Sequence, residues 1–285
     1  MFEFFINLSR IAVPIFVIST MLNVGLTQPL PKILAYLKRW HFFVRMLIAN
    51  FILAPLVMFV ILYSTPFEPP VKAGLLLFSL CAGALFLIKL MQTSQHDLAL
   101  GATTMMLLMV ITVIYVPLVL PLILSGITVD AWAIARSLLM QMLPPIASGM
   151  LAVQVLPDLS ARLQPRVAKL GNYTLYVVLA ATLIGYLPNM SEVFGTGAII
   201  ASLGFIAAAF GTGYVMGGEK DHLQDVGGLG TAQRNTAACM IIATQNFEDP
   251  KVFIIITLAN TLGIVMLLLI AVAISRDNKV HTEMV

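Results

Sequence analysis

Residues 225–238 read DVGGLGTAQRNTAA, a polar, glycine-rich stretch inside a segment that is otherwise apolar and long enough to span a membrane. Lipid offers no hydrogen-bond partners, so an interrupted helix survives there only where protein or a water-filled cavity receives its loose backbone. Arg234 lies near the middle of this segment, and a charged side chain inside the membrane is costly and typically functional. We therefore expect the rest of the chain to hold this stretch in place and to supply the residues that pack against it.

The composition indicates an all-α polytopic membrane protein. Of the 285 residues, 60% are hydrophobic and only 10% are charged, whereas soluble domains carry roughly 25% charged residues. The mean hydropathy is +0.98. The net charge of +3 comes from basic residues that lie mainly between apolar segments. We therefore expect a lipid bilayer as partner and no nucleic acid.

The chemistry-bearing residues do not suggest an enzyme. Cys81 and Cys239 both fall in apolar segments and show neither a disulfide framework nor zinc spacing. The apolar segments hold no carboxylate cluster and no Cys/His nucleophile pair. We expect no catalytic residues, no metal and no cofactor. The leading hypothesis for a chain of this kind is a membrane transporter. The alternatives are a membrane enzyme, a receptor or channel-like protein, and a protein of transporter ancestry that no longer transports.

Hydropathy predicts nine membrane-spanning segments. They lie at about 4–25, 41–63, 70–94, 98–124, 131–156, 168–188, 196–217, 223–246 and 251–274. With the amino terminus outside and the carboxyl terminus inside, ten basic residues face inward and four face outward. The inner set is Lys32, Lys38, Arg39, Arg45, Arg162, Arg166, Lys169, Lys220, Arg276 and Lys279; the outer set is Arg10, Lys72, Arg136 and Lys251.

Two of these segments, 70–94 and 223–246, share a feature: each has a glycine-containing interruption and one basic residue, Lys89 or Arg234. Because they are an odd number of segments apart, they cross the membrane in opposite directions. Paired interrupted helices of opposite direction are typical of inverted-repeat transporters, whose site lies where the two meet. We expect a single transporter domain over 1–285, with repeats at 1–125 and 126–285.

Several motifs, taken in order, resemble the bile acid–sodium symporter family over nearly the whole chain. They are LNVGLT at 22–27, LAPL at 53–56, KAGLLL at 72–77, CAG at 81–83, HDLAL at 96–100, PLVLPL at 117–122 and QRNTAA at 233–238. The resemblance implies ten helices in bacterial members, of which this chain would lack the first. It implies a core domain (segments three, four, seven, eight and nine), a panel domain (segments one, two, five and six), and two discontinuous helices that cross. It also implies sodium-coupled alternating-access transport of small organic anions. For the location we assume the cytoplasmic membrane.

The sequence departs from the family at the positions that bind sodium. The serine–asparagine pair of the first crossover is replaced by Leu87 and Ile88, and the glutamate and glutamine of the second by Gly230 and Arg234. Sodium is a hard cation and prefers oxygen ligands, which these side chains do not supply. We therefore expect no sodium coupling, with sodium symport as the alternative.

Lys89 and Arg234 are the leading site residues. They could act as fixed charges in place of two sodium ions, or they could bind an anionic substrate, which Arg does bidentately for a carboxylate. Lys89 lies about five residues, or about 7 Å, from the inner end of its segment and could instead extend to the headgroups. Arg234 could instead form a structural pair with Asp225.

Further polar residues surround the two interruptions, either lining a substrate site or satisfying unwound backbone. The candidates for substrate binding are Thr231, Gln233, Asn235, Thr236, Thr103, Thr104 and Asn260. His96 and Asp97 could relay a proton, or they could form a turn and a helix cap.

Overall fold

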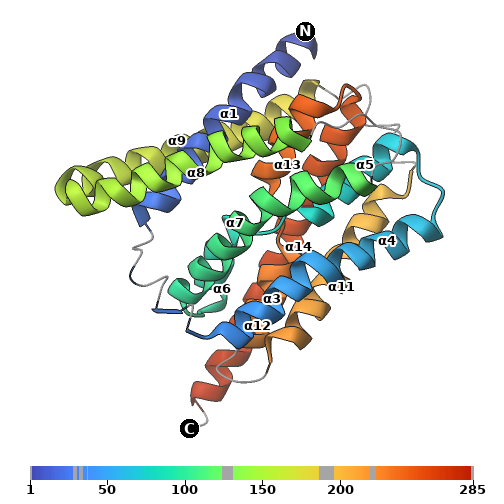
Figure 1. The fold of residues 1–285 in the computed structure, drawn as a ribbon. Coiled ribbons are helices and arrows are strands. Elements are labelled where there is room, and N and C mark those ends of the chain that lie inside the picture. Colours follow the sequence, from blue (N-terminus) through green and yellow to red (C-terminus); the bar gives the residue numbers. More distant parts are fainter. Residues whose placement is uncertain are drawn as a thin grey trace.

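The computed structural model describes residues 2–27, 31, 35–36, 38–123, 131–185, 196–218 and 223–283. These residues form helices and connections, with no strand among them (Figure 1). Lys32 and Lys220, two residues of the predicted inner basic set, lie outside the described part. The helices are α1 (Phe2–Thr27), α3 (Trp40–Ile48), the π-helical η1 (Ala49–Leu53), α4 (Ala54–Ser64), α5 (Pro69–Leu80), α6 (Phe86–Ser94), α7 (Leu98–Ile123), α8 (Ala131–Val155), α9 (Pro157–Gly185), α11 (Ala198–Gly217), α12 (Leu223–Ala232), α13 (Thr236–Asn246) and α14 (Pro250–Glu283).

Six helical segments of the described chain are long and apolar enough to cross a membrane. They are Glu3–Thr27, Trp40–Ser64, Leu98–Ile123, Trp132–Val155, Ala198–Gly217 and Pro250–Arg276. In the part of the chain that the structure describes, the other three predicted segments are not single helices that are long and apolar enough, and each has a physical reason. Segments 70–94 and 223–246 are each divided into two short helices, and α9 begins with a polar stretch that includes Arg162 and Arg166.

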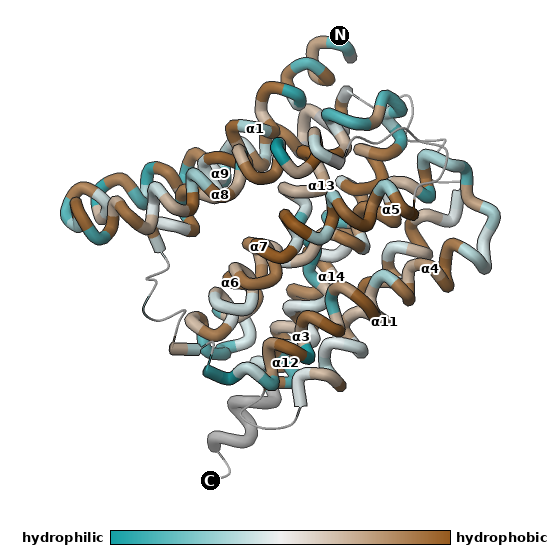
Figure 2. Tube along the Cα trace, in the orientation of Figure 1, coloured by the Kyte–Doolittle hydropathy of each residue, from teal (hydrophilic) through white to brown (hydrophobic). Residues whose placement is uncertain are grey.

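Exposed apolar stripes mark the faces that lipid would cover. On α3, η1 and α4, Ile48, Ile52, Leu56 and Val60 follow at four-residue intervals and are 36–66% exposed. On α7, Val110, Ile114, Leu118 and Leu122 repeat the pattern at 38–81%. Residues four apart lie on one helix face. Figure 2 shows the same helices as largely hydrophobic along their length. Water would penalise such stripes, so they indicate contact with a bilayer.

The predicted interruption in segment 70–94 is confirmed. Helix α5 ends at Leu80, α6 begins at Phe86, and Gly83 between them has φ +81°. Thr112 of α7 accepts a hydrogen bond from the Ala82 N–H and donates one to the Ala82 carbonyl, both at 3.0 Å. A Cβ at Gly83 would lie 2.2 Å from the Met109 nitrogen, so only glycine lets the interruption pack this closely against α7.

The interruption in segment 223–246 lies directly against the first. Helix α12 ends at Ala232 and α13 begins at Thr236. The Asn235 side-chain oxygen caps α13 by accepting from the Ala238 N–H at 3.1 Å, a standard use of Asn. The backbone N–H of Asn235 donates to the carbonyl of Cys81 at 3.0 Å. The two interrupted helices therefore meet at their unwound residues, as the sequence predicts.

The helices form two packed groups. Helices α1, α8 and α9 pack on one another, and the remaining helices pack around the two interruptions (Figure 1). The prediction that segment two belongs with the panel is wrong, because α3, η1 and α4 pack on α11, α5 and α12. The physical reason is Asn50, a fully buried amide that finds its partners at the second interruption.

Candidate functional site

Arg234 lies at the meeting point of the interruptions and is 1% exposed. Its guanidinium lies over the ring of Phe205 in α11, with Cζ 5.2 Å from the ring centroid, a favourable cation–π distance. Its Nη1 donates to Asn50 Oδ1 at 3.4 Å. Its Nε and Nη2 have no hydrogen-bond partner among the described residues. Buried donors are costly when unsatisfied, so this edge of the guanidinium is suited to a ligand.

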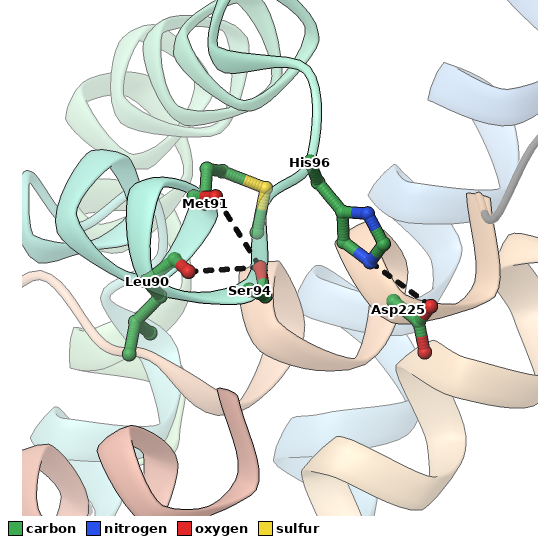
Figure 3. A network of polar contacts seen from close by, with 5 residues as sticks. All are labelled: Leu90, Met91, Ser94, His96 and Asp225. Atoms are coloured by element: carbon green, nitrogen blue, oxygen red, sulfur yellow. Dashed lines mark hydrogen bonds and ion pairs between the residues drawn. The ribbon is translucent and has the colours of Figure 1, made fainter. Parts of the chain in front are cut away.

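Asp225 does not pair with Arg234, so that alternative for Arg234 is wrong. Asp225 Oδ2 lies 2.9 Å from His96 Nε2, and both side chains are under 10% exposed (Figure 3). Asp225 is in the first turn of α12, where the helix dipole favours a carboxylate. Beside this pair, the Ser94 hydroxyl donates to the Leu90 carbonyl at 2.8 Å. The contact between His96 and Asp225 joins the residues that follow α6 to the start of α12.

Of the two alternatives for Asp97, a proton relay or a helix cap, the structure confirms the helix cap. Its Oδ1 accepts from the backbone N–H groups of Ala99 at 2.8 Å and Leu100 at 3.2 Å at the start of α7. Its Oδ2 accepts from the Tyr36 hydroxyl. Burial acts to raise the pKa of Asp97, but the Tyr36 hydrogen bond, the two backbone N–H groups and the Arg39 charge outweigh it and hold the pKa below its usual value.

The predicted residues around the second interruption are buried together. Thr231, Gln233, Asn235 and Thr236 are all at most 8% exposed. Thr231 accepts from Asn50 Nδ2 at 3.1 Å, and Thr236 donates to Asn260 Oδ1 of α14 at 2.5 Å. Asn235 Nδ2 has no partner in the described part of the chain. The structure thus brings Asn260 to the second interruption.

Thr103 and Thr104 of α7 are also buried, and their hydroxyls donate to the carbonyls of Ala99 and Leu100 in the same helix. The Thr104 methyl lies beside the second interrupted helix. A Cβ at Gly230 would lie 3.6 Å from Thr104 Cγ2 and 3.4 Å from Leu87 Cδ2. Leu87 and Gly230, which the resemblance aligns with sodium-ligand positions, therefore lie close to each other, and the Leu87 side chain faces Gly230 with apolar atoms.

Lys89 and Arg234 lie in different environments. Its side chain is exposed on α6, whereas Arg234 is buried at the meeting point. The Lys89 carbonyl accepts from the Thr93 hydroxyl in an ordinary helical contact.

The described residues contain no group of three or more His, Cys, Asp or Glu side chains arranged to hold a metal ion.

Asn50 is the site neighbour that sequence reasoning missed. It lies in η1 and is 0% exposed, and π-turns are frequent at functional sites. Its sequence signal is a lone amide in an apolar segment, followed five residues later by Pro55. That pattern is typical of a helix irregularity, but it does not identify the partner.

Comparison with known proteins relates the chain to a family of transporters. Residues 14–193 match the model of the sodium bile acid symporter family. The chain is also similar to the probable sodium/metabolite cotransporter BASS5 (chloroplastic) of Arabidopsis thaliana, with 25% identity over 191 residues, 64% of this chain and 47% of the relative. The chain thus spans about half the length of that curated relative. The family match covers more than half of this chain and ends before α12.

Proposed function

The chain belongs to the sodium bile acid symporter family, and on that premise we propose that it is a secondary transporter of a small organic anion. Transport proceeds by alternating access, with the group of α1, α8 and α9 moving against the remaining helices around a site at the two interruptions. Arg234 binds the anion. Asn235, Gln233, Thr231, Thr236, Thr104 and Asn260 line or support the site, and Thr103 and Lys89 lie further out.

The observation that carries this proposal is the surplus of donors at the meeting point. Arg234 Nε and Nη2 and Asn235 Nδ2 are buried donors without partners, and the other unpartnered buried side-chain atoms of the described chain lie elsewhere, on Gln141 and Ser160. A ligand that satisfies them must bring acceptors, and a carboxylate does so in a charge-assisted way. At an effective dielectric of about 20, charges 4 Å apart attract by about 4 kcal/mol before desolvation costs.

The coupling we propose is not to sodium. Arg234 itself supplies a positive charge where the family pattern has a sodium ligand, and the apolar contact of Leu87 with Gly230 offers no oxygen. The second candidate is sodium-coupled symport. The family description and the cotransporter name of the relative favour it.

The architecture that fits this function has nine membrane crossings and two inverted repeats, at 1–125 and 126–285. One observation supports the repeat: each interruption receives a polar side chain from the long helix that follows it. Thr112 of α7 donates to the Ala82 carbonyl in the first, and Asn260 of α14 accepts from the Thr236 hydroxyl at the edge of the second. We place the amino terminus outside and the carboxyl terminus inside a cytoplasmic membrane, as the basic residues favour.

Uptake into proteoliposomes tests the function. Labelled acetate, lactate, benzoate and succinate are offered to the wild type, to Arg234→Ala and to Arg136→Ala. The matched control removes an exposed arginine of α8. We expect uptake of at least one anion by the wild type and by Arg136→Ala, and none by Arg234→Ala. Uptake by Arg234→Ala at the wild-type rate would refute the proposal.

A further inference from the structure

We propose that Asn50 is a positioning residue that decides which edge of Arg234 faces the anion, and thereby gives the site a preference for planar carboxylates over tetrahedral oxyanions. The inference rests on the proposed function, because it concerns the same site. It adds Asn50, which lies outside both interruptions, to the site. It also states which class of anion the site prefers.

The orientation of the Asn50 amide follows from its partners. Nδ2 lies 2.9 Å from the Met46 carbonyl, which can only accept, and 3.1 Å from the Thr231 hydroxyl. Oδ1 lies 3.4 Å from Arg234 Nη1, which can only donate. A flipped amide would lose the contacts to Met46 and Arg234 together. The amide therefore holds one corner of the guanidinium in a fixed direction.

The backbone around Asn50 is itself held in an unusual form. In η1 the Ala54 N–H bonds the Ala49 carbonyl, five residues back. Pro55 has no N–H, so the Phe51 carbonyl loses the donor that a regular helix would give it. The Tyr115 hydroxyl of α7 supplies the replacement at 2.7 Å. Pro55 and Tyr115 together stabilise the π-turn that presents Asn50 to Arg234.

These contacts leave one edge of Arg234 without a hydrogen-bond partner among the described residues. The Phe205 ring lies 5.2 Å from Cζ, Asn50 occupies Nη1, and the unpartnered Nε and Nη2 lie side by side on one edge of the guanidinium. Two parallel N–H donors match the two oxygens of a carboxylate lying in the guanidinium plane. The third oxygen of a sulfonate projects out of the guanidinium plane, and the neighbouring Phe205 ring has no hydrogen-bond donor for it.

The test measures thermal stabilisation of the purified full-length protein by matched probes, since a ligand that binds the folded state raises its stability. The pairs are benzoate with benzenesulfonate, and acetate with methanesulfonate. For the wild type we expect a lower half-saturation concentration for each carboxylate than for its sulfonate. For Asn50→Ala we expect this preference to vanish and half-saturation by benzoate to rise about tenfold, as for one lost charged hydrogen bond.

Two further variants keep the test independent of a folding defect in Asn50→Ala. Tyr115→Phe removes only the support of the π-turn, and we expect a smaller loss of preference in the same direction. Arg234→Lys keeps the positive charge but lacks the planar guanidinium with its two parallel N–H donors. We expect this variant to bind a carboxylate and its matching sulfonate equally. An undiminished preference for benzoate in Asn50→Ala would overturn the inference while leaving the proposed function intact. Unchanged stabilisation of Arg234→Ala by benzoate would overturn the proposed function itself.

Discussion

The backbone N–H of Asn235 donates a hydrogen bond to the carbonyl of Cys81, 3.0 Å away. This bond joins the unwound residues of two helices that are far apart in the chain. The Cys239 thiol adds a second link by donating to the Leu77 carbonyl at 3.6 Å. Because buried backbone groups need partners, each interruption stabilises the other. The ends of four half-helices, α5, α6, α12 and α13, converge there around Arg234.

The two basic residues should differ in importance. We expect Arg234→Ala to abolish anion uptake and Lys89→Ala to reduce it by a small factor, because only Arg234 is buried at the meeting point. Initial uptake rates at equal protein incorporation provide the measurement. Equal loss in both variants would mean that the two cations act as a pair.

Gly83 should not tolerate a side chain. Its φ of +81° imposes strain on any other residue, and an added Cβ would overlap the Met109 nitrogen at 2.2 Å. We expect Gly83→Ala to lower the free energy of unfolding by more than about 2 kcal/mol. Gly204→Ala is the matched control, because a Cβ there has nothing within 4 Å. Thermal unfolding in detergent compares the two, and equal stability would contradict the role given to Gly83.

Thr112 should stabilise the first interruption through its hydroxyl. Thr112→Val keeps the shape but leaves the Ala82 N–H and carbonyl without the bonds they now make. We expect a loss of about 1–3 kcal/mol in stability, the cost of unsatisfied buried groups. Thr112→Ser retains the hydroxyl and should lose less. If the Val variant unfolds at the wild-type temperature, the hydroxyl does not support the interruption.

Asp97 should contribute stability that depends on pH. Its pKa is lower in the folded protein than its usual value, so its contribution is present above the unfolded-state value of about 3.9 and is lost as the pH falls through the folded-state value. We expect Asp97→Asn, which keeps a capping oxygen, to be less stable than wild type at pH 7. The difference should shrink when melting is followed down to about pH 3. A difference that stays constant with pH would exclude the carboxylate charge as its source.

Much of this architecture could be predicted from the sequence because its signals are local. Hydropathy places the helices, and glycines with polar neighbours mark the interruptions near Gly83 and Arg234. The contacts between distant segments could not be predicted. Asn50 lies in an apolar segment, and nothing local shows that it bonds Arg234 or that segment two joins the core. Asp225 likewise gives no local sign that His96, rather than Arg234, is its partner.

The most direct test of the central claim is the thermal stability of the wild-type protein in sodium, lithium, potassium and choline chloride at equal ionic strength, each with and without benzoate. A cation that binds the folded state stabilises it by mass action. If Arg234 supplies the positive charge at the site, benzoate should stabilise the protein to the same extent in all four salts. A saturable stabilisation that requires sodium would contradict the account and favour sodium symport in its place.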